Sequence, residues 1–213
     1  MKITKLGHCC LLIEDKGLRI LTDPGSYSTA QNDLKNIDAI LITHEHGDHL
    51  HVESLKAVLA NNPSARVITN TAVGKILAAE NIAFEIIEGT AAGMIGEIAI
   101  EARDGKHEEI YGDMGQVQNT GYLIAEKLFY PGDAYTAPGV PVDILALPVA
   151  GPWCKIPEAI RYALKIKPRV AFPVHDAMLQ KERVGSAYFA PQKVLPENGI
   201  EFTPIADGES RDF

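Results

Sequence analysis

The sequence is short of the features that mark secreted, disulfide-stabilised and membrane-spanning proteins. Three cysteines, two of them adjacent as Cys9 and Cys10, do not make a disulfide framework, so we expect reduced thiols and a cytoplasmic protein. No run approaches the roughly 20 apolar residues that span a bilayer. The first residues mix charges with apolar positions and lack a signal-peptide core. We therefore expect no membrane partner.

The chain also lacks an excess of basic residues. Its 20 Lys and Arg against 28 Asp and Glu give a formal net charge of −8. Proteins that bind nucleic acids usually present a basic face, so no nucleic-acid partner is expected. The expected partner is a small-molecule substrate, and the sequence leaves open whether the chain forms a homo-oligomer.

The length and the order of apolar segments predict one α/β domain covering residues 1–213. A chain of this length can bury a substantial core, and it contains no low-complexity tract or exact repeat. Helical spacing predicts helices over residues 52–62, 71–81 and 156–167. Short apolar runs predict strands over residues 2–7, 9–15, 18–25, 38–43, 65–70, 83–88, 94–103, 119–126, 127–133, 142–151 and 168–176. A strand block followed by a βαβ unit occurs twice, which indicates two mixed sheets packed face to face with helices outside, a four-layer αββα sandwich.

The segment LITHEHGDHLH holds four of the seven histidines of the chain. Imidazole and carboxylate groups suit zinc, manganese, iron or nickel better than magnesium or calcium. Four ligands so close in sequence cannot easily reach one ion. We therefore expect His44 and His46 to bind one metal and Asp48 and His49 a second, with Gly47 permitting a sharp backbone path between the pairs.

Metal-competent residues also follow three separate strands. His44 follows AILIT, Asp133 follows LFYPG and His175 follows VAFPV. Because ligands bind beyond the carboxyl ends of strands in α/β sheets, we expect these residues to form one site. Two cations ~3.5–4 Å apart repel each other and need a shared anionic ligand and a bridging hydroxide. Asp133 is the candidate for that bridge.

The segment THEHGDH matches the His-x-His-x-Asp-His signature of the metallo-β-lactamase superfamily. The later segments GKHEE, YPGDA and FPVHDA follow in the order of the remaining ligand motifs of that family. The resemblance implies the metallo-β-lactamase fold and two divalent ions, Zn²⁺ first, with Mn²⁺, Fe²⁺ or Ni²⁺ as alternatives. It places His44, His46 and His107 on the first metal, and Asp48, His49 and His175 on the second, with Asp133 between them.

Two early segments, GHCCLLIED and LTDPG, resemble the small bacterial metal-dependent hydrolases related to ascorbate-phosphate lactonase. This resemblance implies that His8 lies near the metal centre and that Asp23 supports a metal ligand from behind. Other interpretations stay open. His8 can be a packed or hydrogen-bonded histidine, and Asp23 can be only the turn residue of Asp-Pro-Gly.

Some assignments rest on a weaker pattern. His107 lies in a long polar stretch, where Glu108, Glu109 or Asp113 could bind metal instead. His51 is expected to face solvent in the first turn of the following helix. Trp153, the only tryptophan, either stacks on substrate or lies buried under a loop.

The expected chemistry is hydrolysis. Two metals lower the pKa of a bound water to near ~7 and stabilise the oxyanion that forms on attack. Asp48 can accept the proton of that water, so Asp48 and His8 are the candidate catalytic residues. We expect cleavage of an ester, lactone or phosphodiester-type bond in a small soluble substrate. The alternatives are a mononuclear-iron oxygenase on the same fold, a nuclease acting on RNA or DNA, and a catalytically idle metal protein.

Overall fold

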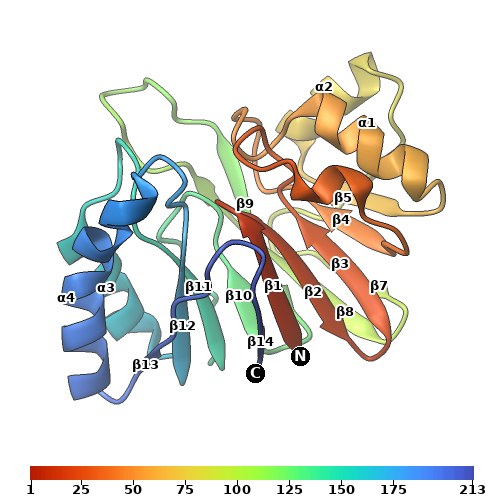
Figure 1. The fold of residues 1–213 in the computed structure, drawn as a ribbon. Helices are drawn as coiled ribbons and strands as arrows, with labels where there is room; N and C mark the ends of the chain where they lie inside the picture. Colours follow the sequence, from red (N-terminus) through yellow and green to blue (C-terminus); the bar gives the residue numbers. More distant parts are fainter.

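The computed structural model describes residues 1–213, apart from the side chain of Lys181. Two seven-stranded sheets pack face to face (Figure 1). In the first sheet the order of strands is β14 (Ser210–Asp212), β1 (Lys2–Gly7), β2 (Cys10–Asp15), β3 (Leu18–Thr22), β4 (Ala39–Leu41), β5 (Arg66–Thr69) and β6 (Glu85–Ile86). In the second it is β13 (Glu201–Phe202), β12 (Val170–Val174), β11 (Ile144–Pro148), β10 (Leu128–Tyr130), β9 (Gln118–Ile124), β8 (Ile98–Lys106) and β7 (Ala92–Ile95).

Both sheets are mixed. Strands β3 to β6 pair in parallel, as do β10 to β13, whereas β1 to β3 and β7 to β10 pair antiparallel. Four of the parallel pairs, β4–β5, β5–β6, β11–β12 and β12–β13, are joined by crossovers that contain an α-helix, which is the usual connection between parallel strands. The expected four-layer αββα sandwich of two mixed sheets is confirmed.

Helices cover the outer faces of the sandwich. Helices α1 (Val52–Asn61) and α2 (Thr71–Ala79) pack on the first sheet, and α3 (Ile156–Ile166) and α4 (Val184–Glu197) pack on the second. In Figure 1 the two helix pairs lie on opposite sides of the sheets. Two short 3-10 helices, η1 (Ala30–Asp33) and η2 (Lys181–Arg183), lie in connections. Within the described part of the chain, no helix is long and apolar enough to cross a membrane.

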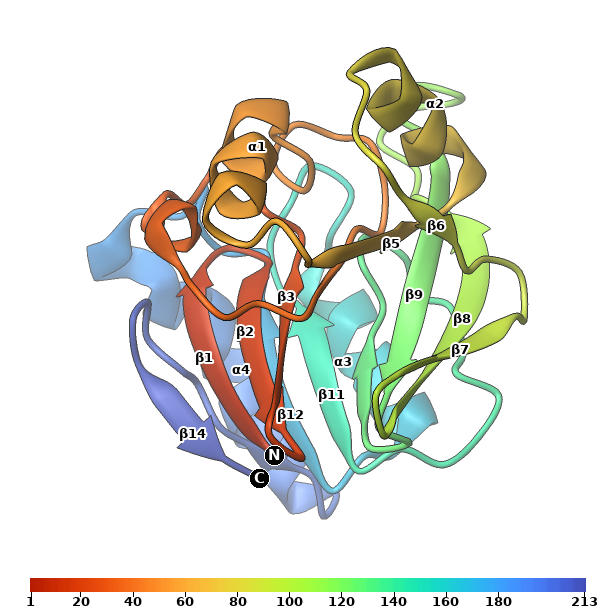
Figure 2. The same cartoon turned by 90° about the vertical axis from the view of Figure 1, so that its right-hand side faces the viewer.

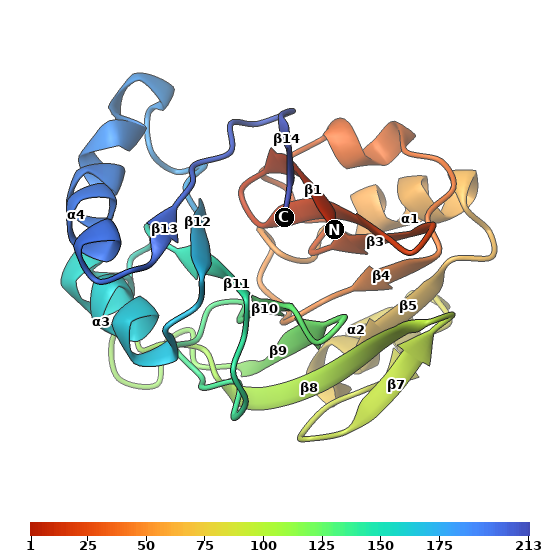
Figure 3. The ribbon, with the colours of Figure 1, turned by 90° about the horizontal axis from the view of Figure 1, so that it is seen from below.

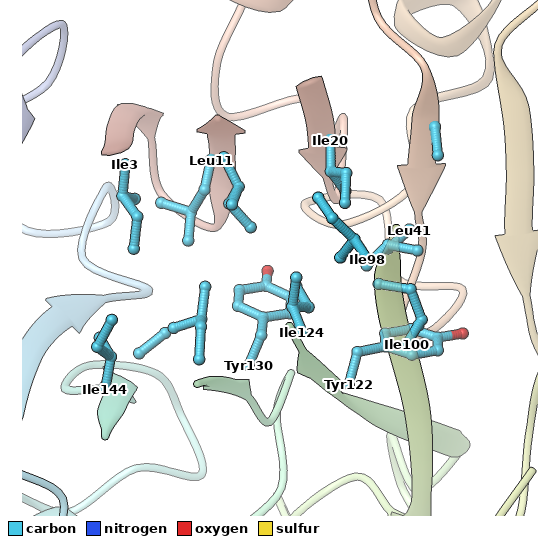
Figure 4. Close-up of a cluster of buried hydrophobic side chains, with 14 of the residues drawn as sticks. Ile3, Leu11, Ile20, Leu41, Ile98, Ile100, Tyr122, Ile124, Tyr130 and Ile144 are labelled. Carbon is cyan, nitrogen blue, oxygen red and sulfur yellow. The ribbon is translucent and has the colours of Figure 1, made fainter. Parts of the chain in front are cut away.

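The main core lies between the two sheets. Alternating residues of each strand point inward, so that Ile3, Leu11 and Ile20 of the first sheet face Ile124 and Tyr130 of the second (Figure 4). These side chains are fully buried. Complete burial of one such aliphatic side chain stabilises a fold by about 1.5–3 kcal/mol. The strand pattern read from the sequence therefore forms one contiguous core.

Several segments differ from expectation, among them strands β13 and β14, which lie in a part of the chain where the sequence predicted no element. Residues 94–103, expected as one strand, form part of the hairpin β7–β8, which turns at Gly96 and Glu97 (Figure 2). Apolar residues continue on both sides of the turn, so the hydrophobic pattern of the sequence does not indicate where the chain reverses. Helix α4 was not expected, because Pro191 and Pro196 lie inside it. Packing of its buried residues, among them Leu195, on the second sheet stabilises the helix.

The two ends of the chain meet at the edge of the first sheet. Strand β14 pairs antiparallel with β1, and the termini lie side by side (Figure 3). At the other end of the sandwich, the connections after β4, β8, β10 and β12 come together (Figure 1). Each of these four connections carries residues that the sequence proposes as metal ligands.

Candidate metal centre

The connection between β4 and α1 supplies four of the expected ligands. His44 and His49 are fully buried, whereas His46 and Asp48 are partly exposed. A second loop holds this connection in place, since Ser26 N–H donates to the carbonyl of Gly47 at 2.9 Å. The loops touch so closely at Gly25 that a Cβ there would lie 1.8 Å from the carbonyl oxygen of Asp48. Only glycine fits at that position.

The expectation about Gly47 is wrong. Its backbone is outside the positive-φ region, and a Cβ at Gly47 would have no neighbour within 4 Å among the described residues. The turn closes instead through hydrogen bonds to the carbonyl of His46 from the N–H groups of His49 and Leu50. Ordinary residues can adopt this path. The glycine that the loop needs is Gly25, which the sequence did not single out.

The first group of potential ligands contains His44, His46 and His107. One ring nitrogen from each lies within 4.8 Å of the others. His107 Nδ1 lies 2.6 Å from the carbonyl oxygen of Glu108, so this nitrogen carries the proton and Nε2 is free to bind a cation. The structure thus brings His107 into the group.

The acidic alternatives to His107 are engaged elsewhere. Glu108 accepts a hydrogen bond from the N–H of Tyr135 at 2.9 Å, and Glu109 accepts one from Gly112 at 2.9 Å. Among the described residues, neither they nor Asp113 belong to a cluster that could hold a metal. His107 is the residue of this stretch that reaches the site.

The second group contains Asp48, His49, Asp133 and His175, again with atoms within 4.8 Å of one another. Asp133 Oδ2 lies 2.8 Å from His175 Nε2, and Asp133 Oδ1 lies 3.1 Å from His49 Nε2. Asp133 also faces the first group, since its Oδ2 lies 3.3 Å from His107 Nε2. The carboxylate of Asp133 therefore lies between the two groups, as expected of a bridging ligand.

Several buried atoms of these groups have no hydrogen-bond partner in the described structure. They are the Nε2 atoms of His44 and His49, both ring nitrogens of His175, and Oδ1 of Asp133. Buried polar atoms are nearly always paired in native proteins. Imidazole nitrogens and carboxylate oxygens that converge without hydrogen-bond partners fit divalent cations, so this set of side chains agrees with the expected metal site.

Asp23 connects the two groups from behind. It is fully buried, and its Oδ2 accepts hydrogen bonds from His49 Nδ1 at 2.7 Å, Thr43 Oγ1 at 2.8 Å and Tyr130 OH at 2.6 Å. Because Thr43 Oγ1 gives its proton to Asp23, it accepts from His44 Nδ1 at 3.0 Å. One carboxylate thus orients His49 directly and His44 through Thr43.

The sequence missed two parts of this network. Thr43 separates the apolar strand from His44, and Tyr130 ends the strand before Asp133. Their positions next to ligand motifs are the only sequence signal for a supporting role. Asp23 is therefore more than the turn residue of Asp-Pro-Gly, because its carboxylate accepts hydrogen bonds from His49, Thr43 and Tyr130.

His8 lies beside the second group. It is buried in a left-handed backbone conformation with φ 55°, as is His175 with φ 63°. His8 Nδ1 accepts from the N–H of Ala177 at 3.3 Å, so the proton is on Nε2, which lies 3.1 Å from Asp48 Oδ2. Burial lowers the pKa of His8 to about 4, against the opposing hydrogen bond with Asp48. His8 is a neutral donor to Asp48.

Opposite charges set the protonation of the second group. Burial raises the pKa of Asp133, but His175 and His49 outweigh burial and bring it well below its usual range. Burial also raises the pKa of Asp48, and hydrogen bonds with His175 and His8 bring it down. Both carboxylates are ionised at neutral pH and available to cations.

The histidines respond to burial in different ways. Burial, with His49 beside it, holds the pKa of His44 well below its usual range. Burial lowers the pKa of His49 too, but Asp133 and Asp23 outweigh it and the pKa rises well above normal. Burial also lowers the pKa of His175, but the carboxylate of Asp133 outweighs burial and raises this pKa to about 9. The cluster attracts positive charge at the second group.

Two other expected residues can be placed. Trp153 is 5% exposed and packs edge-on against His107 and His175, with ring centroids 5.6 and 5.4 Å apart. It is a buried aromatic that contacts one residue of each group. His51 is exposed and outside the metal groups, and its side chain caps α1 by accepting from the N–H of Ser54.

Comparison with known proteins agrees with this fold. Residues 2–175 match the family model of the β-lactamase superfamily domain. Protein Rv0786c of Mycobacterium tuberculosis is 34% identical over 197 residues, which cover 88% of this chain and 90% of that protein. A UPF0173 metal-dependent hydrolase of Carboxydothermus hydrogenoformans is 28% identical over 194 residues, with 82% and 84% covered.

Solved structures give the same fold. The metallo-β-lactamase fold protein YhfI from Bacillus subtilis aligns with a TM-score of 0.75 at 13% identity, covering 99% of this chain and 98% of that chain. An αββα sandwich with clustered His and Asp side chains at one end defines a protein of the metallo-β-lactamase fold. The chain belongs to the β-lactamase superfamily.

Proposed function

We propose that this protein is a metal-dependent hydrolase whose dinuclear centre cleaves an ester, lactone or phosphodiester-type bond in a small substrate. One observation carries the proposal. The carboxylate of Asp133 lies 2.8 Å from His175 Nε2 and 3.3 Å from His107 Nε2, so it faces ligands of both groups. A buried carboxylate between two sets of unpaired imidazole nitrogens is suited to a pair of cations.

Seven residues would hold the metals. The first ion would take His44, His46 and His107, the second Asp48, His49 and His175, with Asp133 shared between them. Imidazole and carboxylate ligands favour zinc, with manganese, iron or nickel as alternatives. When bound, the ions would lower the pKa of a water molecule and polarise the carbonyl or phosphoryl oxygen of the substrate.

Asp48 is the residue of the chain that would accept the proton. Its side chain is 20% exposed, whereas that of Asp133 is 1% exposed, so Asp48 faces incoming water and substrate. The hydrogen bond from His8 Nε2 fixes the carboxylate of Asp48. His8 itself is 1% exposed and acts through Asp48, so we assign it a positioning role.

The second group favours a hydrolase over a one-iron oxygenase. A single iron bound by the first group would not need Asp48 and His49, yet both belong to a complete second set around Asp133. The net charge of −8 also favours a small substrate over RNA or DNA.

The test is metal quantification together with a hydrolase panel on freshly purified protein. We expect two transition-metal ions per chain and turnover within a panel of sugar-phosphate lactones, cyclic phosphodiesters, esters and β-lactams. Asp133→Ala should remove both turnover and metal. The matched control is Asp143→Ala, because Asp143 pairs with Arg169 on the surface at 2.8 Å. One iron per chain with oxygen-dependent turnover would favour the oxygenase, and full metal content in Asp133→Ala would contradict the shared-ligand assignment.

A further inference from the structure

A cavity of about 540 Å³ lies beside the metal centre, at the open edge between the two sheets. The segment after β12, the start of α4, β1 and the connection from β13 to β14 enclose it. That connection runs between β12 and β1 in Figures 1 and 3. Residues that line the cavity include Lys5, Tyr27, Asp176, Val184, Tyr188 and Ile205. Its volume is within the range of small-molecule sites, about 300–1,000 Å³.

A buried ion pair lies in the wall of this cavity. Lys5 points inward because it follows Ile3 by two residues along β1, and its side chain is 2% exposed. Its ammonium lies 2.5 Å from Asp176 Oδ2, which also accepts a hydrogen bond from Tyr188 OH. An ammonium has three N–H donors, and only one has an acceptor among the described residues. Because buried donors are rarely left unpaired, Lys5 is suited to a ligand atom that accepts hydrogen bonds.

The cavity and the metal centre share their boundary. The ring of Tyr27 lies 4.9 Å from that of His8, and the N–H of Ala177 donates to His8 Nδ1 at 3.3 Å. His8 in turn contacts Asp48, and Asp176 directly follows His175. Tyr27, which is 48% exposed and lines the cavity, therefore lies on the side of the metal centre from which a substrate bound at Asp48 would reach the cavity.

We propose that this cavity binds the part of the substrate that is not cleaved, an uncharged arm with an apolar body and a hydrogen-bond acceptor. The inference rests on the proposed hydrolase function and specifies its substrate class. Ile205 and Val184 provide apolar walls, and Lys5 would meet a carbonyl, ether or hydroxyl oxygen. Asp176 already balances the charge of Lys5, and Asp207 and Glu209 add negative charge to the lining, so a phosphate or carboxylate on this arm would be repelled.

The first experiment uses p-nitrophenyl esters with acyl chains from acetate to hexanoate on the metal-loaded protein. Each methylene that enters the cavity should raise kcat/KM about fourfold, which corresponds to about 0.8 kcal/mol. Ala206→Trp fills the cavity from its lining and should reduce the hexanoate-to-acetate ratio at least tenfold. The matched control is Ala60→Trp on the exposed face of α1, which should keep the ratio. A ratio that Ala206→Trp leaves unchanged would overturn the inference.

The second experiment needs no turnover, so it separates the cavity from the hydrolase function. Binding of 2-octanone, an uncharged chain with one carbonyl, is followed by ligand-observed NMR on the same loaded protein. Ala206→Trp should weaken this binding at least tenfold, and octanoate should bind the unaltered protein at least tenfold more weakly than 2-octanone. If no member of the hydrolase panel is cleaved but 2-octanone binding behaves in this way, the hydrolase proposal fails and the cavity stands as a binding site for uncharged molecules. Octanoate binding as tight as that of 2-octanone would overturn the uncharged class.

A third comparison tests the role of Lys5. Removing Lys5 alone would leave the Asp176 carboxylate buried and without its cation, which by itself destabilises the fold. The double change Lys5→Met and Asp176→Leu removes both charges together. It should weaken 2-octanone binding about tenfold, and unchanged binding would contradict the assignment of Lys5 as donor to the arm.

Discussion

The most informative perturbation of the metal centre is Asp23→Asn, because Asp23 contacts His49 of one group directly and reaches His44 of the other through Thr43. The substitution keeps the shape of the side chain but can replace Oδ2 by an amide NH₂. Thr43 Oγ1 and Tyr130 OH can rotate to accept from that amide. His49 can accept only if its proton moves from Nδ1 to Nε2, and Nε2 is the atom that faces Asp133. The change therefore favours the tautomer of His49 that cannot bind a metal.

The magnitude follows from the contact that is lost. The hydrogen bond from His49 Nδ1 to Asp23 is 2.7 Å long and fully buried. Hydrogen bonds to charged groups contribute about 1.5–3 kcal/mol. At about 1.4 kcal/mol per factor of ten, this is a loss of roughly 10–100-fold in affinity at the His49 group. The effect at His44 should be smaller, because Thr43 lies between Asp23 and His44.

The assay is competition for Zn²⁺ against a chromophoric chelator, which resolves the two affinities. We expect one of the two ions to bind 10–100-fold more weakly and the other to change less. Asp38→Asn is the matched control, since Asp38 accepts one backbone hydrogen bond from Arg19 at 2.7 Å away from the metal groups. If Asp23→Asn bound both ions within twofold of the unaltered protein, Asp23 would not orient the ligands.

Three further predictions follow from single contacts. Gly25→Ala forces the connection between β4 and α1 to move, so it should lower the metal content measured by elemental analysis. Gly47→Ala has free space around its Cβ and should keep the metal content. Equal metal content in the two variants would contradict the argument that Gly25 lies too close to Asp48 for a side chain. His46→Ala should lower metal content, whereas His51→Ala should keep it and lose only a helix cap, about 1 kcal/mol or 2–4 °C in Tm by calorimetry. Burial raises the pKa of Cys154 to about 11, so its reaction with DTNB should be slow at pH 8 and rise about tenfold per pH unit as thiolate forms; a fast reaction at pH 8 would contradict this.

The sequence predicted the order of layers and the identity of most candidate ligands. Alternating and helical apolar patterns depend on local geometry, so they can be read without knowing the neighbours of each strand. The segment HEHGDH is equally local, because its crowded imidazole and carboxylate groups have few uses other than binding metal. His44, Asp133 and His175 each follow the end of a strand, which predicted that they meet, because the carboxyl ends of parallel strands lie at one edge of a sheet.

The tertiary structure decided the features that depend on residues far apart in the chain. It selected His107 over its acidic neighbours, linked Asp23 to Tyr130 across the two sheets, and paired Lys5 with a carboxylate 171 positions away. It also made Gly25 the required glycine, because backbone from another loop fills the space beside it. None of these contacts leaves a periodic or local trace in the sequence. They arise only when the packing of the sheets brings distant segments within hydrogen-bonding distance, and that packing is set by the whole core.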